Sequence, residues 1–376
     1  MSARGKSILI VGGGFSGMSA AIQFRKAGAI VDLVEIDPGW RSYGAGISMG
    51  GASLRALRTI GVLDAFRERG AVHDGAELRT ADDRLIATLP TPRLAGPDVP
   101  GEGGILRPEL AAILAEATRA SGAHVKLGST FERLEDGPDG VRATLSDGAT
   151  ATYDLVIGAD GLGSRVRETV APEAPKPRYV GQAVWRALAP TPPDIQRTTM
   201  WMSPSVKVGV NPISRDQMYL FLTENRPNND RIEPSRFVPM LTELLAPFAS
   251  PVIQTLRGHL GEGSSIVYRP LEWLLLPRPW YRGRVVLIGD AVHATTPHLA
   301  SGACMGFEDA IVLAEEVDRA ESLPAALAAF EARRWERCRL VVENSVRLAD
   351  IEISGGSPAE HGRLMKESFG TLAAPI

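Results

Sequence analysis

The sequence predicts an α/β protein, in which a parallel sheet covered by helices is interrupted by a second, mainly β region. Three observations predict this fold. The chain opens with an apolar strand, a glycine-rich turn and a helix, SILIVGGGFSGMSAAIQFRK at residues 7–26. Two later segments, 155–167 and 285–293, each repeat an apolar strand followed by a polar loop. Between them, residues 178–267 contain strand-like runs separated by Pro, Asn and Asp, which is typical of a separate sheet.

The elements at the N-terminus follow one another without a gap. Residues 8–11 are a short apolar run of the buried-strand kind. Residues 15–26 have the pattern of a helix that Gly28 ends, and residues 30–36 read as a second strand. This order of strand, turn, helix and strand is that of a Rossmann-like βαβ unit.

The glycines of the turn have the spacing G-x-G-x-x-G and carry a chemical prediction. Gly12 permits a sharp turn, Gly14 permits a pyrophosphate to approach the backbone, and Gly17 permits the helix to pack closely on the strand. The free N–H groups at the start of the helix then receive the phosphate. Glu35, at the end of the second strand, is placed to accept hydrogen bonds from a ribose, and glutamate disfavours a 2′-phosphate. The turn therefore predicts a site for NAD or FAD.

The sequence beyond Asp37 favours FAD over NAD. An NAD-binding domain usually continues with alternating strands and helices. This chain continues instead with RSYGAGISMGGASLRALRTIGVLDAF, a second glycine-rich turn that enters an amphipathic helix. A hairpin around the polar turn 81–84 follows. In the later sheet region, strands are expected within 181–190, 198–214 and 217–224, and a helix from about Pro234 to Leu245.

The composition excludes several classes of protein. Of the 376 residues, 44% are hydrophobic and 23% charged, and the net charge of −3 offers no basic surface for nucleic acid. Cys304 and Cys338 have neither the spacing of metal ligands nor a disulfide framework, which suits a reducing compartment. No apolar run reaches the length of a membrane span. We therefore expect a cytoplasmic protein without a metal, nucleic-acid or membrane partner.

A set of ordered motifs extends these observations. They are GGGFSG with Glu35, RSYGAGIS, LRPEL with Arg107, DGLGSRVR, and GDAVH followed by proline, glycine and EDA. In this order they resemble the group A FAD-dependent aromatic monooxygenases, the family of para-hydroxybenzoate and salicylate hydroxylases. The stretches PHLASGACMGFEDA and VWRAL are most similar to the heteroaromatic hydroxylases of the 6-hydroxynicotinate 3-monooxygenase type.

The resemblance implies both a fold and an activity. The fold is a Rossmann-like FAD-binding domain of the glutathione-reductase type, with an inserted β-sheet substrate domain and a C-terminal helix. The activity is hydroxylation of an electron-rich aromatic or N-heteroaromatic ring with NADH or NADPH and O2, through a flavin C4a-hydroperoxide in a dry pocket. The protein would be a monomer or a homodimer. An FAD-dependent oxidase or dehydrogenase, and a non-catalytic FAD-binding sensor, are the alternatives.

The resemblance also divides the chain. Residues 1–71, 100–177 and 268–350 would form the discontinuous FAD-binding domain. Residues 72–99 and 178–267 would form the substrate domain. Residues 351–376 would form a C-terminal tail.

Cofactor-binding residues follow from the matching motifs. Glu35 would hold the adenosine ribose, Arg107 would lie over the phosphates and ribityl chain, and Asp290 would bind the ribityl hydroxyls. Asp160, with Ser164 and Arg167, belongs to a loop that the family shares between FAD and nicotinamide binding. The helix that begins near Gly302 would direct its N–H groups at the pyrimidine edge of the flavin, where reduced flavin gathers negative charge. The full set is Gly12, Gly14, Phe15, Ser16, Gly17, Glu35, Ile36, Arg41, Arg107, Phe131 (through its backbone, near the adenine), Asp160, Asp290, Gly302 and Ala303.

Substrate-side residues form a second set. Arg186, beside Trp185 in a mostly apolar strand, is the better anion partner, with a structural salt bridge as the alternative. Lys207 could pair with a carboxylate or phenolate, or be a solvated strand lysine. His298 is the better candidate for handling a proton, whereas His293 would cap local structure. The catalytic candidates are Ser48, Arg186, Lys207, Asn211, Tyr219 (alternatively core), Pro297 (through its carbonyl) and His298. Glu308 and Asp309 are read as complements of a helix dipole or as catalytic groups.

Overall fold

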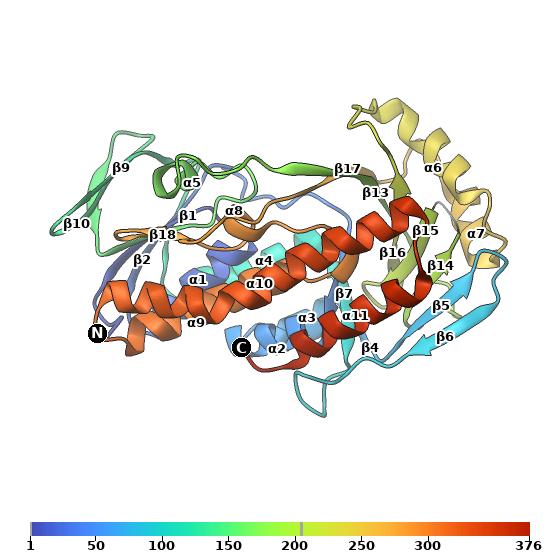
Figure 1. Cartoon of the computed structure of the whole chain (residues 1–376), viewed down its shortest axis with the longest axis horizontal. Coiled ribbons are helices and arrows are strands. Elements are labelled where there is room, and N and C mark those ends of the chain that lie inside the picture. The colour runs from blue at the N-terminus through green and yellow to red at the C-terminus, as the bar shows by residue number, and fades with distance from the viewer. Residues whose placement is uncertain (1, 204–205) are drawn as a thin grey trace.

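The structure, a computed structural model, describes residues 2–203 and 206–376. A helix-covered parallel sheet lies at one end of the elongated molecule and a large, mainly antiparallel sheet at the other (Figure 1). The predicted α/β class is therefore confirmed. The expected strand region 198–214 includes residues 204–205, which lie outside the described residues.

The first sheet contains six strands whose neighbours are distant in sequence. In spatial order these are β18 (Tyr281–Arg282), β19 (Val285–Leu287), β12 (Leu155–Gly158), β1 (Ser7–Val11), β2 (Ile30–Glu35) and β8 (His124–Leu127). All pairs are parallel except the outer pair of β18 with β19. The strands expected at 8–11, 30–36, 155–157 and 285–288 are confirmed to within a residue or so.

The parallel arrangement determines where the polar loops meet. Parallel strands present their carboxyl ends at the same edge of a sheet, where α/β proteins bind their ligands. The glycine turn after β1, the Asp-Gly loop after β12, the Gly-Asp loop after β19 and Glu35 at the end of β2 are consequently brought to one edge.

Helices cover this sheet. The helix expected over residues 15–26 is α1 (Phe15–Lys26), which packs against α4 (Arg107–Ala120) and α9 (Gly302–Arg319). The long α10 (Leu323–Ser354) lies on α9 and ends beside the second large sheet (Figure 1). The core between them is apolar and close-packed, with Ile8, Leu9 and Ile10 of β1 fully buried.

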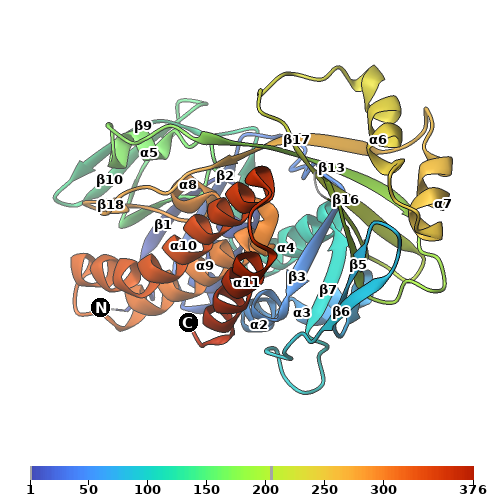
Figure 2. The same cartoon turned by 45° about the vertical axis from the view of Figure 1, so that its right-hand side comes forward.

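Two small sheets and further short helices also belong to this half. One sheet is β11 (Thr150–Tyr153), β10 (Gly140–Leu145) and β9 (Phe131–Gly137), and the other is β3 (Gly46–Gly50), β7 (Glu102–Leu106) and β4 (Ala71–His73). The helices include α2 (Gly51–Ile60), α3 (Leu63–Arg69), α5 (Val166–Val170) and the short η2 (Pro297–Leu299). The sheet of β3, β7 and β4 lies next to the second large sheet, as Figure 2 shows.

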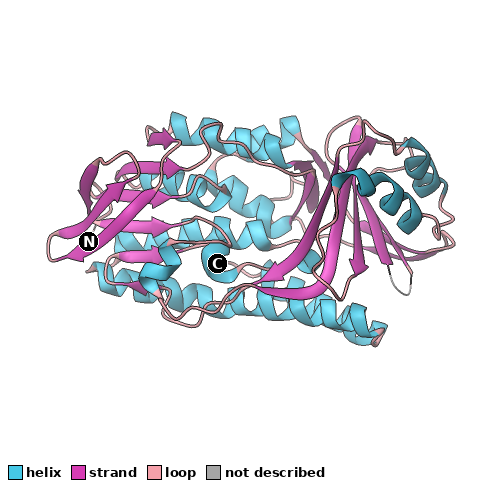
Figure 3. Ribbon diagram, turned by 90° about the horizontal axis from the view of Figure 1, so that it is seen from above, coloured by secondary structure: helices cyan, strands magenta, loops and turns pink. Residues whose placement is uncertain are grey.

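The second large sheet has seven strands. Their order is β17 (Ile266–Trp273), β13 (Arg178–Pro190), β16 (Gln217–Asn225), β15 (Val206–Pro212), β14 (Thr198–Met202), β5 (Ala76–Thr80) and β6 (Leu85–Leu89). The predicted hairpin around 81–84 is thus β5 and β6, which extend this sheet at its edge. The helix expected near 234–245 is η1 (Pro234–Arg236) continued by α6 (Phe237–Leu245), and with α7 (Pro251–His259) it covers the outer face (Figure 3).

The C-terminal segment differs from the expected tail. Gly355 adopts φ +64° and ends α10, and a second helix, α11 (Pro358–Ala373), follows at once. Ser357 caps α11 by accepting a hydrogen bond from the N–H of Glu360, and Pro358 occupies the first turn, where no N–H is needed. The chain therefore ends in two helices rather than one. Among the described residues, no helix is both long and apolar enough to cross a membrane.

Candidate active site

The three glycines of the G-x-G-x-x-G spacing are required for two different reasons. A Cβ on Gly12 would lie 2.4 Å from the carbonyl oxygen of Ala159, and one on Gly17 would lie 2.0 Å from that of Gly12. A Cβ on Gly14 would meet no atom of the described residues within 4 Å. Gly12 and Gly17 therefore allow the chain itself to pack, whereas Gly14 keeps open the space in front of α1. This is the space that a pyrophosphate needs.

Two side chains form hydrogen bonds with the backbone of Gly13. Glu35 Oε2 accepts a hydrogen bond of 2.6 Å from the N–H of Gly13, and the indole Nε1 of Trp40 donates one of 2.8 Å to the carbonyl oxygen of Gly13. The second carboxylate oxygen of Glu35 accepts from the N–H of Asp37 at 2.8 Å. Glu35 thus shapes the turn, and its contact with a ribose remains a prediction. The role of Trp40 was not found from the sequence, because an isolated tryptophan carries no spacing signal.

Arg107 places an unpaired cation beside the turn. Its guanidinium carbon lies 4.7 Å from the centre of the Phe15 ring. In the described part of the chain, no acceptor bonds to this guanidinium. Burial lowers the pKa of Arg107, and the nearby Asp290 opposes that effect. Asp290 itself is exposed at the start of α8 (Asp290–His293). A desolvated cation over Phe15, together with the N-terminus of α1 that begins at Phe15 and has no side-chain cap, fits the phosphates of FAD.

The loop from Asp160 to Arg167 is held by bonds within the protein. Asp160 Oδ2 accepts from the N–H groups of Arg165 at 2.8 Å and Val166 at 3.1 Å, and Oδ1 accepts from the Ser164 hydroxyl at 2.5 Å. Asp160 therefore caps α5. The buried Arg167 guanidinium donates to the carbonyl oxygens of Leu162 at 2.9 Å and Ala291 at 3.0 Å. It thereby ties the Asp-Gly loop to the Gly-Asp loop, and the expected nicotinamide contact remains a prediction.

Three further cofactor candidates lie near the adenosine end of the predicted site. Arg41 is exposed and forms an ion pair of 2.9 Å with Asp37. The Ile36 side chain, which is 69% exposed, follows Glu35 directly. The Phe131 ring is buried beneath the guanidinium of Arg165, and its backbone pairs with β10. Their contacts with FAD remain predictions.

The start of α9 is built for close approach. Cβ atoms on Gly289 and Gly306 would lie 2.3 and 2.1 Å from the Ser16 hydroxyl, so α1 and α9 meet where only glycine fits. Ser16 therefore directs its side chain at α9, and only its backbone faces the space in front of α1. The first turn of α9, with Gly302 and Ala303, has no side-chain cap. Within the described residues, the N–H groups of Gly302 and Ala303 have no partner and can bind a ligand.

Four of the seven substrate-side candidates share one face of the seven-stranded sheet. Side chains alternate across a strand. Trp185 and its neighbours on the outer face pack under α6 and α7. The inner face carries Arg186, Tyr219, Asn211 and Lys207, which the strand register aligns. This inner face looks toward β3 and the end of α10, as contacts to Ser48 and Glu352 establish (Figure 2).

A series of hydrogen bonds connects two residues of this face with two residues of the small sheet beside it. The amide of Asn211 donates to Ser48 Oγ at 2.7 Å, and its oxygen lies 2.9 Å from His73 Nε2. Ser48 Oγ lies 2.6 Å from the Tyr219 hydroxyl. Burial raises the pKa of Tyr219, which keeps its O–H protonated. A Cβ on Gly46 would lie 2.1 Å from the Tyr219 ring, so the ring rests directly on the β3 backbone. Tyr219 is therefore fixed in position and is not only a core residue.

Glu102 and His73 were not predicted. Burial raises the pKa of Glu102 to about 7, although the Thr198 hydroxyl donates to it at 2.8 Å. Burial also lowers the pKa of His73. Both lie on adjacent strands, β7 and β4, between the two sheets. Only the pairing of distant strands brings these groups together, so no local pattern could have indicated them.

The comparisons with known proteins agree with this geometry. The chain matches the family described as FAD binding domain over residues 6–345. This chain belongs to that family. It is 33% identical over 356 residues to aurachin C monooxygenase/isomerase of Stigmatella aurantiaca, covering 92% of this chain and 90% of that protein. It is also 33% identical over 345 residues to 2-heptyl-3-hydroxy-4(1H)-quinolone synthase of Pseudomonas aeruginosa, covering 90% and 87%.

A solved structure shows the same fold. HpxO of Klebsiella pneumoniae, complexed with FAD and uric acid, superimposes with a TM-score of 0.86 at 24% identity, covering 98% of this chain and 97% of that one. The predicted family, fold, FAD and class of reaction are confirmed. The chain is an FAD-dependent aromatic-ring monooxygenase that uses NAD(P)H and O2.

In this monooxygenase, His298 and Lys207 both bond to other side chains of the protein. His298 is buried, with Nδ1 at 2.8 Å from the Thr296 hydroxyl and Nε2 at 2.9 Å from the Gln182 oxygen. Lys207 Nζ lies 2.6 Å from Glu352 Oε1, and the two side chains are 15% and 13% exposed. Lys207 is therefore not a solvated strand lysine. Glu352 lies in the segment that was expected to be a tail.

Glu308 and Asp309 have a different role from that expected. Both are buried, so they are not simple complements of the helix dipole. Asp309 accepts from the N–H of Gly289 at 2.9 Å and pairs with His293 at 2.6 Å and Arg334 at 2.8 Å. Glu308 pairs with Arg334 and with Arg337, each at 2.8 Å. The cluster joins the Gly-Asp loop to α9 and α10. His293 is accordingly part of a buried ion pair and not a local cap.

Three members of this region have the atoms of a metal site. The ligand atoms of His293, Asp309 and Cys338 lie within 4.8 Å of one another. Arg334, however, donates to Asp309 and lies 3.5 Å from Cys338 Sγ. Its guanidinium thus supplies the positive charge that these groups would otherwise seek in a cation.

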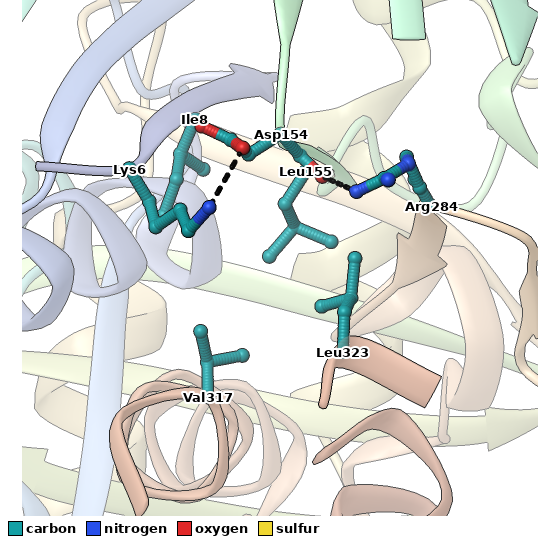
Figure 4. A pocket seen from close by; sticks show the side chains of 7 residues that line it. All are labelled: Lys6, Ile8, Asp154, Leu155, Arg284, Val317 and Leu323. Atoms are coloured by element: carbon teal, nitrogen blue, oxygen red, sulfur yellow. Dashed lines mark hydrogen bonds and ion pairs between the residues drawn. The ribbon is translucent and has the colours of Figure 1, made fainter. Parts of the chain in front are cut away.

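A small cavity lies at the opposite edge of the parallel sheet. It has a volume of about 20 Å³ and is lined by Lys6, Asp154 and Arg284 with four apolar side chains (Figure 4). Lys6 Nζ bonds to Asp154 Oδ1 at 3.1 Å. The lining therefore closes the amino ends of β1 and β12, away from the edge that carries the glycine turn.

Proposed function

We propose that the substrate is a planar N-heteroaromatic ring with an ionisable ring oxygen, and that this oxygen binds at Arg186 and Tyr219. The names of relatives support this class: a 4(1H)-quinolone synthase, a urate hydroxylase and 6-hydroxynicotinate 3-monooxygenase. FAD, when bound and reduced by NAD(P)H, would activate O2, so that one oxygen atom goes to an electron-rich ring carbon and the other leaves as water.

The environment of the Arg186 guanidinium is the single observation that carries the proposal. Its guanidinium has no hydrogen-bonded acceptor within the described residues, although the side chain is only partly exposed. Burial lowers the pKa of Arg186, and the neighbouring Arg269 adds to that effect. A desolvated and unpaired guanidinium is stabilised when an anion binds. An anionic ring oxygen is also the electron-rich form that hydroxylation requires.

Tyr219 supplies the second contact. Ser48 receives the hydrogen bond from Asn211, and this bond fixes the Ser48 oxygen beside the Tyr219 hydroxyl. The Phe221 ring, centred 5.7 Å from the Tyr219 ring, lines the same face. This pair of aromatic rings suits a flat ligand. The carbonyl of Pro297 would face the same ring from the flavin side.

The remaining assignments belong to the same proposal. FAD would be held by the fourteen cofactor candidates of the sequence, with Gly14 and Arg107 at the phosphates. Residues 72–99 and 178–267 would act as the substrate domain, and residues 1–71, 100–177 and 268–350 as the FAD domain. The free, buried Cys304 and Cys338 support a cytoplasmic location. The oligomeric state would be a monomer or homodimer.

Isotope labelling tests the reaction. With NADH or NADPH and 18O2, candidate hydroxyquinolones, purines and hydroxypyridines should yield a product that carries one labelled oxygen by mass spectrometry. Peroxide formation without labelled product would indicate an oxidase, and flavin that NAD(P)H never reduces would indicate a sensor.

Replacement of Arg186 tests the binding site. Arg186→Gln should raise the KM for an anionic substrate by about 10- to 150-fold, because a hydrogen bond to a charged group contributes about 1.5–3 kcal/mol. Arg186→Lys should retain part of the affinity. Steady-state kinetics measure both, and Arg178→Gln, an exposed arginine on the same strand that stacks on Trp273, is the control. Equal KM values for all variants would refute the assignment.

A further inference from the structure

The end of α10 reaches the substrate side of the pocket. Glu352, one turn before Gly355, contacts β15 through Lys207 at 2.6 Å and α11 through His361 at 3.2 Å. Its other oxygen lies 3.6 Å from Nε2 of His298. Figure 1 shows this end of α10 beside the strands that carry the substrate candidates. One carboxylate therefore meets three basic groups from three different elements.

The hydrogen bonds assign one nitrogen of His298. Gln182 donates its amide to Asn225 at 3.0 Å, so its oxygen faces His298. His298 Nε2 therefore carries a hydrogen and donates it to Gln182. Nδ1 lies 2.8 Å from the Thr296 hydroxyl, which can donate to a neutral imidazole or accept from an imidazolium. Both charge states of His298 therefore fit these bonds, and the surrounding charges and burial decide between them.

The charges around His298 oppose one another. Glu352 on α10 favours the imidazolium, whereas Lys207 on β15 and His361 on α11 disfavour it. Burial is the largest influence and lowers the pKa of His298. Lys207 lies on the inner sheet face with Arg186 and Asn211, so its charge also acts on a substrate there. Glu352 is the only carboxylate that pairs with Lys207 in the described part of the chain.

We propose that Glu352 is a positioning residue: by neutralising Lys207 and facing His298, it sets the protonation state of His298 and the pH range in which the pocket works. The C-terminal helices thereby control the charge of the substrate side. Only the kinetic consequence of this role rests on the proposed function.

The direct test is the titration of His298 in the FAD-loaded protein, followed by NMR with labelled histidine and assigned with His298→Asn. Glu352→Gln removes the negative charge, so the midpoint for His298 should fall by about 1 pH unit relative to the unmodified protein. The double variant Lys207→Gln with Glu352→Gln should restore the midpoint, because both charges are then absent. This measurement needs no substrate, so it is independent of the proposed reaction.

The matched control is Glu360→Gln. Glu360 forms an exposed pair of 3.4 Å with Arg347 across the same two helices, so the variant changes the net charge equally without touching His298. Glu352→Asp keeps the negative charge and replaces Glu352→Gln in the test if that variant does not fold. The His298 midpoint in Glu352→Asp should lie closer to that of the unmodified protein than the midpoint in Glu352→Gln.

The kinetic consequence follows from the same charges. In Glu352→Gln, the uncompensated Lys207 stabilises the bound anionic substrate, so the acidic limb of kcat, which reports the enzyme–substrate complex, should move down by about 1 pH unit. Glu360→Gln should leave this limb in place. An unchanged His298 midpoint in Glu352→Gln, or an equal shift in Glu360→Gln, would overturn the proposal. An absence of labelled product with the His298 shift intact would overturn only the proposed reaction.

Discussion

Gly14→Ala should yield a protein that folds normally and binds FAD at least about 100-fold more weakly. In the part of the chain that the structure describes, the added methyl meets no atom within 4 Å, and the backbone at φ −73° and ψ −177° accepts alanine. The free energy of unfolding of the apoprotein should therefore change by less than about 0.5 kcal/mol. The methyl would displace the pyrophosphate from the N–H groups of α1, and two hydrogen bonds to a charged group contribute about 1.5–3 kcal/mol each.

Gly17→Ala provides the contrast. Its methyl would lie 2.0 Å from the Gly12 carbonyl oxygen, so α1 cannot keep its place on β1. We expect loss of folded protein by circular dichroism, whereas Gly14→Ala should keep its spectrum and fail only in a titration of FAD fluorescence. Full FAD affinity in Gly14→Ala would mean that the phosphates lie elsewhere.

Asp309→Asn should lower the free energy of unfolding by about 3–5 kcal/mol, because it leaves the buried His293 without its carboxylate partner and leaves Arg334 with Glu308 alone. Asp309 is fully buried and pairs with both His293 and Arg334. It also accepts from the N–H of Gly289, so the variant should disturb the Gly-Asp loop as well. Urea unfolding at pH 7 measures the loss. Asp98→Asn, which breaks an exposed pair with Arg58, is the control and should change stability by less than about 1 kcal/mol.

The pH dependence of this loss has a definite sign. Burial alone would raise the pKa of Asp309, but His293 and Arg334 hold it at about 2. A lowered carboxyl pKa stabilises the fold above the ordinary value of 3.8, and this stabilisation disappears as the pH falls toward about 2. About 2 kcal/mol of the difference between the two proteins should therefore vanish between about pH 4 and pH 2. A difference that does not depend on pH over this range would assign the loss to packing.

The pKa of His293 acts at the other end of the pH scale. Burial would lower it, but Cys338 and Asp309 raise it well above its ordinary value of 6.5. A raised histidine pKa stabilises the fold below 6.5, and this contribution is lost only as the pH rises through the folded value. The ion pair with Asp309 consequently remains intact at neutral pH.

Much of the fold was predictable because its signals are local. The helix over 15–26, the strands that flank it and the hairpin around 81–84 were each indicated by fewer than about 20 adjacent residues, the range over which periodicity and turn residues act. The segment after Asp350 was less clear, since a short polar helix depends on its packing against α10. For that reason α11 was not expected.

The candidate site likewise contains some residues that the local sequence indicates and others that only the tertiary structure brings together. Gly12, Gly14 and Gly17 were recognisable because each answers a steric demand of one turn. Arg186 stood out as a charge in an apolar strand. No local pattern marks His73, Glu102 or Glu352. The sequence indicates Asn211 as a candidate but not its hydrogen bonds to Ser48 and His73.

By itself the sequence determined the FAD turn, the parallel strands around it and the class of chemistry, because spacing along one short segment already specifies how a backbone meets a phosphate. Only the tertiary structure decided which acids and bases face one another. Lys207 and Glu352 are separated by 145 positions and lie 2.6 Å apart. The free energy of such a charge depends on its solvent exposure and its partners, and both exist only after distant strands and helices have packed together.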